Sequence, residues 1–344
     1  MIGSLGGFAS LGDLARLLAV PLLGWAALRD VRTRRVPNWV WYVLGGLGAV
    51  LLAAELARSA PFAGRYARLE LFRIAVSIGL VVPLSYLFWR IGGFGGADAK
   101  ALMALSVLFP TYPAYYPPAT LFGVPFPPVL PAEPTLVGVF SLTVLTNTVL
   151  VGALFPVVLA ARNALAGRVE PAMFLARVVP IDELRHRHGR LFEDRSGFTR
   201  SGLDVDALRM YLRWRGLALA ELRAAPERYR DPDSVGETFD ATDGAVDPTA
   251  AEHGDASADV ETATATDGGS DDPWAAERFL DDIDGSAYGT DPETLREGLE
   301  TVVREEAVWL SPGLPFLVPM FVGLLIGLTY GDLLYGLLTA VGLA

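Results

Sequence analysis

Long runs of apolar residues constrain this chain more than any other feature. A helix that crosses the hydrocarbon core of a bilayer needs about 20 predominantly apolar residues. The fourth of the runs is the least regular, because Pro110 interrupts it early and the span must continue into a Pro- and Tyr-rich stretch. The expected spans are 8–28, 38–56, 69–89, 99–109 with part of that Pro- and Tyr-rich stretch, 136–161 and 314–343. The predicted fold class is therefore all-α, a polytopic membrane protein of about six transmembrane helices.

Acidic residues gather in one block between the fifth and the sixth span, which predicts a solvated insert. Residues 231–277 contain no Lys or Arg and offer few apolar residues to bury, so we expect this tract to be disordered. Leu203 to Leu222 has helical spacing of apolar residues, as does the stretch from Pro292 to Trp309. The predicted divisions are a membrane part with five helices at 1–162, an amphipathic segment at 163–230, the acidic tract at 231–277, a short helical segment at 278–311 and the last transmembrane helix at 312–344.

The arginines of the short loops predict the orientation, because cytoplasmic loops carry an excess of positive charge. Four arginines lie between residues 29 and 37, and Arg90 and Lys100 flank the turn before the fourth span. The loop 110–135 has neither Lys nor Arg, although the loop after the second span carries three arginines and favours the opposite orientation. On balance both termini lie outside and the insert is cytoplasmic.

Several classes of chemistry are excluded or receive no support. The chain has no cysteine, which excludes disulfides, thiol catalysis and Cys-ligated zinc. His186 and His188 lie in a polar stretch, and we interpret them as solvated residues, since the chain has one other histidine, His253, and no Cys to complete a metal site. We see no phosphate-binding loop, dinucleotide fingerprint or basic nucleic-acid-binding patch, so no cofactor and no nucleic acid is expected.

Two aspartates are the best catalytic candidates, since ionisable groups at the edge of a span are where function is first sought in a membrane protein. Asp30 ends the first span and Asp98 begins the fourth, so the two lie at the same face of the membrane. Separately, each has a plainer interpretation: Asp98 as a helix cap after a glycine-rich turn, and Asp30 as a solvated acid beside arginines. Two neighbouring carboxylates at the edge of lipid share a proton, so one activates a water while the other polarises a carbonyl.

The residues around both acids resemble the type IV prepilin peptidase family, and especially its archaeal branch, which processes prepilins and prearchaellins. In that family a catalytic Asp follows the first span and precedes a basic loop with Pro-Asn, and a second lies in a G-x-G-D motif followed by Lys. Ala97 stands where the general motif has Gly, which matches the archaeal form, and the stretch 312–321 also resembles the last helix of the family. The corresponding residues here are Asp30, Pro37, Asn38, Gly95, Gly96, Asp98 and Lys100.

This resemblance implies an aspartic endopeptidase with Asp30 and Asp98 as catalytic residues and Gly95, Gly96, Lys100, Pro37 and Asn38 in support. It would cut the short basic class III signal peptide from prepilin-like and prearchaellin precursors at the cytoplasmic face of the cell membrane, without a metal. Two alternatives stay open: a presenilin-like or signal-peptide-peptidase-like intramembrane protease, and an ion-coupled small transporter that is not an enzyme. A transporter would place its acids near the midplane of the bilayer, whereas these two lie at the ends of spans.

The choice of charged residues indicates a salt-adapted proteome, such as that of a haloarchaeon. Lys100 is the single lysine among 28 Lys and Arg residues, and the formal net charge is −11. Clustered carboxylates hold hydration and net charge in strong brine. A compact ammonium two residues from Asp98 could also hold the charge state of that carboxylate.

Overall fold

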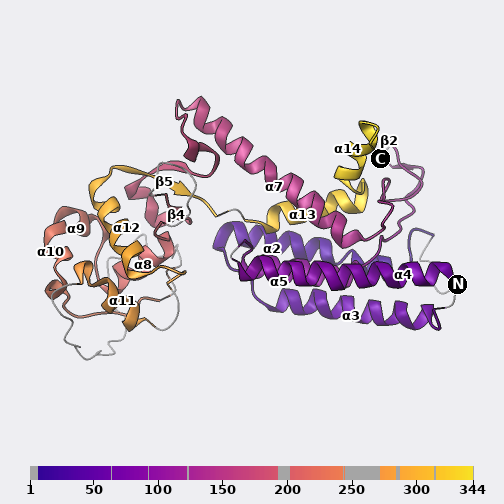
Figure 1. Cartoon of the computed structure of the whole chain (residues 1–344), viewed down its shortest axis with the longest axis horizontal. Coiled ribbons are helices and arrows are strands. Elements are labelled where there is room, and N and C mark those ends of the chain that lie inside the picture. Colours follow the sequence, from indigo (N-terminus) through magenta and orange to yellow (C-terminus); the bar gives the residue numbers. More distant parts are fainter. Residues whose placement is uncertain are drawn as a thin grey trace. The chain divides into compact units, whose positions relative to one another are not determined.

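The computed structural model describes residues 7–62, 64–91, 93–121, 124–192, 202–242, 244, 272–283, 287–313 and 315–343. The chain divides into two compact units (Figure 1). We call Met1–Phe155 with Pro315–Ala344 the membrane unit, and Pro156–Leu314 the insert unit. The helix α7 belongs to both, because the division falls at Pro156 inside it.

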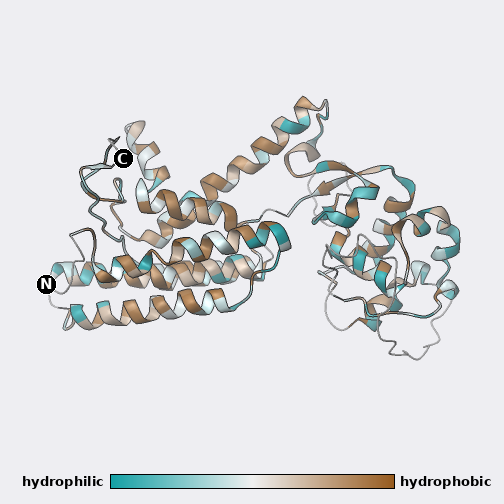
Figure 2. Ribbon diagram, turned by 180° about the vertical axis from the view of Figure 1, so that it is seen from behind, coloured by the Kyte–Doolittle hydropathy of each residue, from teal (hydrophilic) through white to brown (hydrophobic). Residues whose placement is uncertain are grey.

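Helices dominate the membrane unit, and its described part has four candidate spans that are long and apolar enough to cross a membrane. These are Leu11–Thr33, Trp39–Ser59, Arg65–Arg90 and Phe140–Leu165. Large apolar side chains on these helices, such as Val50 on α3, stay exposed, as expected of helices that face lipid. The hydropathy colours of the ribbon show that much of these helices is hydrophobic (Figure 2). The elements are α1 (Leu11–Arg16), α2 (Ala19–Thr33), α3 (Trp39–Ser59), α4 (Arg65–Val76), the π-turn η1 (Ser77–Val81), α5 (Val82–Arg90), α6 (Gly96–Leu108), β1 (Thr120–Leu121), β2 (Val124–Pro125), α7 (Phe140–Leu165), α13 (Leu317–Thr329) and α14 (Leu333–Ala340).

The expected count of six full-length spans is not confirmed, and the fourth stretch shows one reason. Its helix α6 has only 13 residues and ends at Leu108, before Pro110. The guanidinium of Arg16 caps that end, because its Nε donates to the Leu108 carbonyl over 2.8 Å. Arg16 also pairs with Asp13 at 2.8 Å and with Glu55, so the three charged residues form one network.

The last apolar stretch differs in a similar way, because it forms two helices instead of one. The break falls at Asp332, which is 4 % exposed. Its Oδ1 accepts from the Tyr335 backbone N–H over 2.9 Å and so caps α14, while its Oδ2 accepts from the hydroxyls of Thr143 (2.8 Å) and Thr146 (3.0 Å) on α7. A buried carboxylate must be hydrogen-bonded. Asp332 therefore joins α14 to α7.

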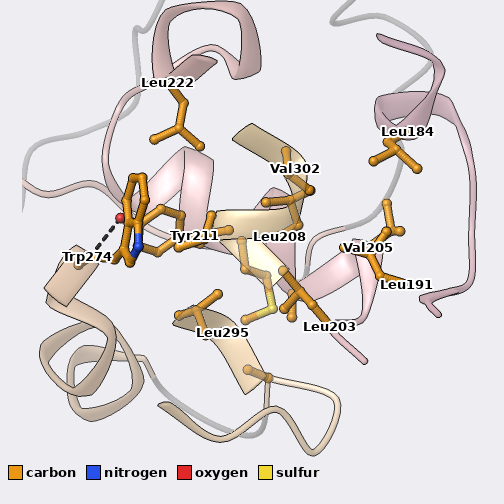
Figure 3. Packing of buried hydrophobic residues seen from close by; sticks show 14 of the residues in the cluster. Leu184, Leu191, Leu203, Val205, Leu208, Tyr211, Leu222, Trp274, Leu295 and Val302 are labelled. Atoms are coloured by element: carbon orange, nitrogen blue, oxygen red, sulfur yellow. Dashed lines mark hydrogen bonds between the residues drawn. The ribbon is translucent and has the colours of Figure 1, made fainter. Parts of the chain in front are cut away.

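The insert unit has a soluble-type core of its own, built from a three-stranded antiparallel sheet and short helices. Strand β5 lies between β3 and β4, and Val179 pairs with Val308 across the first of these ladders. Tyr211 and Trp274 are almost completely buried, and the Tyr211 hydroxyl donates to the Trp274 carbonyl over 2.7 Å (Figure 3). The elements are η2 (Pro171–Phe174), β3 (Arg177–Pro180), η3 (Ile181–His186), β4 (Arg190–Leu191), α8 (Val205–Trp214), α9 (Leu219–Ala224), α10 (Pro226–Arg230), η4 (Pro232–Ser234), η5 (Pro273–Ala275), α11 (Ala276–Asp282), α12 (Pro292–Arg304) and β5 (Ala307–Ser311).

The two ends of the acidic tract 231–277 are ordered parts of this unit, which differs from the expected disorder. At the first end, Ala241 is buried and the Phe239 N–H donates to the Trp214 carbonyl over 3.0 Å. At the second, Asp272 accepts from Arg296 over 2.7 Å, and Trp274 lies in the core. Few but well-placed apolar residues are enough to anchor these ends. The remainder of the expected disorder, residues 245–271, lies outside the described residues.

Candidate active site

Asp30 lies near the C-terminal end of α2, on a face that turns into the membrane unit. Asp30 is 8 % exposed and is one of few charged residues that are buried in the described part of the chain. The helix ends four residues later, where Arg34 adopts a left-handed conformation (φ 55°) and donates its N–H to the Asp30 carbonyl over 2.9 Å. Asp30 therefore lies inside the helix, with the basic turn directly after it in the sequence.

Asp98 lies in the first turn of α6. Its Oδ2 accepts a hydrogen bond from the Gly95 N–H over 3.1 Å, so the carboxylate caps the helix and faces its positive end. A Cβ atom at residue 95 would lie 2.8 Å from that oxygen. Glycine at position 95 thus keeps the space beside the carboxylate open. The capping role and a catalytic role are compatible, because the cap uses one carboxylate oxygen.

The fold brings the two acids together from segments that lie 68 positions apart in the sequence. The Asp98 carboxylate lies within electrostatic range of Asp30. Arg34 lies within electrostatic range of both carboxylates. With two carboxylates in this range of one another at the end of membrane helices, one can act as a base on water while the other, protonated, donates.

Arg34 is the site residue that sequence reasoning missed. Its charge entered only the argument about orientation, as one of four arginines in the same loop. The spacing was the available signal, since a residue four positions after Asp30 returns to the same helical face. The sequence does not show that α2 ends at Arg34 in a left-handed conformation.

The supporting residues of the two motifs also meet. The Lys100 Nζ donates to the Asn38 Oδ1 over 2.8 Å, which joins α6 to the start of α3. Pro37 lies in the bend between α2 and α3, and its carbonyl accepts from the Val40 N–H over 3.4 Å. Gly96 lies beside the indole of Trp89, whose Nε1 would be 3.6 Å from a Cβ atom at this position. All the expected site residues thus lie around one end of the membrane unit.

Aromatic rings that the sequence did not single out pack beside this end. The ring of Phe94, the residue before Gly95, stacks on Phe88 with centroids 5.0 Å apart and meets Phe316 at 4.9 Å. Phe316 precedes α13, so the rings connect the turn before α6 to the last part of the chain.

In the described residues we find no group of three or more His, Asp or Glu that could hold a metal ion.

Comparison with known proteins points to the same region. Residues 17–160 match the model of the type IV leader peptidase family. A preflagellin peptidase from Methanococcus voltae is 29 % identical over 131 residues, which cover 37 % of this chain and 53 % of that protein. The chain therefore spans about half the length of this curated relative. Asp30 and Asp98 both fall within the matched residues 17–160, and the two similarities support a relationship of this membrane segment to the type IV leader peptidases.

Proposed function

We propose that this chain is a membrane aspartic endopeptidase that removes the short basic leader of prepilin-like and prearchaellin precursors at the cytoplasmic membrane face. The observation that carries the proposal is the approach of Asp30 to Asp98 within a segment similar to type IV leader peptidases. One carboxylate takes a proton from a water molecule as it attacks the scissile carbonyl. The other, protonated, donates its proton to the carbonyl oxygen. As the tetrahedral intermediate collapses, this second carboxylate takes that proton back, and the first passes the proton that it took from water to the leaving amine.

The position of the acids fits a substrate whose helix stays in the bilayer. Asp30 ends a candidate span and Asp98 begins a helix at the same end of the membrane unit. A precursor with a basic leader followed by an apolar helix would place its cleavage site at this depth, just before the helix. The stretch 29–35 next to the acids is rich in arginine, and the leader is basic as well. We therefore assign substrate binding to the surrounding polar and aromatic groups and not to this stretch.

The proposal is tested with the purified full chain in bilayer nanodiscs and a prepilin-like precursor. We expect a single cut between the basic leader and the apolar helix, identified by the masses of both products. A precursor with its basic leader residues replaced by glutamine serves as the matched substrate. Absence of cleavage at that junction, in a preparation that is folded and inserted, would contradict the proposed function.

The Lys100–Asn38 bond provides a second prediction, on the positioning of Asp98. We expect Lys100→Ala and Asn38→Ala each to lower kcat by about tenfold, since loss of this bond frees the start of α6. The double variant should lose little more than either single one, because both remove the same interaction. Lys100→Arg should restore part of the rate. Measurement of kcat and KM for the four variants checks this, and fully additive losses would show that the two residues act separately.

A further inference from the structure

The segment that connects α7 to β3, residues 162–177, is a compact turn at the end of a candidate span. Asn163 holds it closed: its side chain is buried, and its Nδ2 donates to the carbonyls of Met173 and Ala176, both over 2.8 Å. The Arg168 N–H also donates to the Asn163 carbonyl over 2.9 Å. Because Arg162 precedes Asn163 and Arg177 follows Ala176, these bonds bring the two arginines together. We call residues 162–177 the connector.

Positive charge is concentrated around Arg177. Its guanidinium is partly buried and lies within electrostatic range of Arg162 and of Arg187. Burial lowers the pKa of Arg177, the charges of Arg187 and Arg162 lower it further, and Glu183 raises it. Glu183 pairs with Arg187 at 2.6 Å and offsets one of the three charges. The Arg177 Nε is buried without a hydrogen-bond partner among the described residues. The exposed guanidinium of Arg162 and the partly exposed one of Arg187 are therefore the groups that an anion can reach, with the charge of Arg177 behind them.

The same connector presents apolar side chains to its surroundings. Leu165 is 90 % exposed, Val169 is 73 % exposed and Phe174 is 47 % exposed. Nothing in the described core of the insert unit covers them, although Ala172 and Ala176 of the same segment are buried. Large apolar residues interleaved with arginines are typical of a surface that lies in the headgroup region of a bilayer.

Chain continuity identifies the partner. Helix α7 has 26 residues, and about 20 cross the hydrocarbon core, so its final residues lie at the membrane boundary. Arg162 and Leu165 are in that last turn. A guanidinium group can bind two phosphate oxygens at once, and lipid phosphates are the anions at the membrane boundary. We propose that the connector docks on anionic lipid headgroups through Arg162, Arg177 and Arg187, with Leu165, Val169 and Phe174 inserted between the lipids.

The absence of cysteine from the chain allows a direct test. The full chain with Val169→Cys, labelled with a polarity-sensitive dye, is placed in nanodiscs with increasing fractions of phosphatidylglycerol in phosphatidylcholine. We expect a blue shift of the emission as the anionic fraction rises, and quenching by nitroxide lipids. Arg162→Gln and Arg177→Gln should each lower the ratio of docked to undocked connector by about fivefold. Arg162 is exposed, so its variant keeps the test valid if Arg177→Gln disturbs the fold.

Three controls separate docking of the connector on lipid from general charge effects and from binding of a soluble anion. Arg304→Gln, on an exposed arginine of α12, should leave the emission unchanged, and a dye at Glu227→Cys should not respond to lipid charge. Inorganic phosphate added to neutral nanodiscs should also have no effect. Equal emission from Val169→Cys in neutral and anionic nanodiscs would overturn the proposal, as would a full response to inorganic phosphate, which would assign the cluster to a soluble anion.

Discussion

Replacement of either Asp30 or Asp98 by asparagine is expected to lower the rate of leader cleavage by about 10²–10⁴-fold, the range that a general acid or base contributes. The asparagine amide neither takes a proton from water nor donates one to the carbonyl oxygen. Each variant therefore lacks either the base or the acid, and the remaining aspartate cannot fill both roles. Folding should be preserved at Asp98, because an asparagine oxygen can still accept the hydrogen bond from Gly95. The measurement is a single-turnover cleavage assay in nanodiscs.

The matched control for this experiment is Asp182→Asn. It makes the same chemical change on an exposed aspartate of η3, outside the membrane unit, and should leave the rate unaltered. Equal expression and membrane insertion of all variants separates a lost reaction from a lost fold. Retained cleavage in either active-site variant would rule out the two-aspartate mechanism. Equal loss in Asp182→Asn would assign the effect to general damage.

Much of the candidate site can be deduced from the sequence by simple geometry. Asp30 ends one apolar run, Asp98 begins another, and two segments that cross between the same faces must bring these residues to one side. The Lys100–Asn38 contact was not predicted, because the family motif names the two residues separately and no spacing rule connects residues 62 positions apart. Arg34 depended on a backbone conformation at the end of α2 that a row of similar arginines does not reveal.

The helix interruptions were harder to foresee than the helices. The run after Ala99 looked long enough only if it continued through prolines, and the structure ends α6 at Leu108 with a bond from Arg16. At the other end of the sequence, Asp332 breaks an apolar stretch that hydropathy treats as continuous. At α6 a buried guanidinium from a distant segment satisfies the free carbonyl, whereas Asp332 caps α14 locally and is held by the distant hydroxyls of Thr143 and Thr146. These long-range partners leave no record in local composition.

A second large effect is expected at Gly48, where α3 packs directly against the backbone of α6. A Cβ atom on residue 48 would lie 2.8 Å from the Leu108 nitrogen and 2.9 Å from its Cα. Backbone cannot rotate away as a side chain does, so the helices must separate. Small residues allow this kind of close packing between membrane helices. We expect Gly48→Ala to lower the free energy of unfolding by about 1–3 kcal/mol, the cost of overpacking.

Gly46→Ala provides the matched control on the same helix, because a Cβ atom there has nothing within 4 Å. This variant should be neutral or more stable by up to about 1 kcal/mol, since alanine favours the helix more than glycine. Thermal unfolding of both variants in nanodiscs measures the difference. Helix α3 begins beside Asn38 and α6 carries Asp98 and Lys100, so the separation at Gly48 should also slow cleavage. Equal stability of the two alanine variants would show that the helices do not pack at this distance, and a stable but slow Gly48→Ala would connect their spacing directly to the geometry of the acid pair.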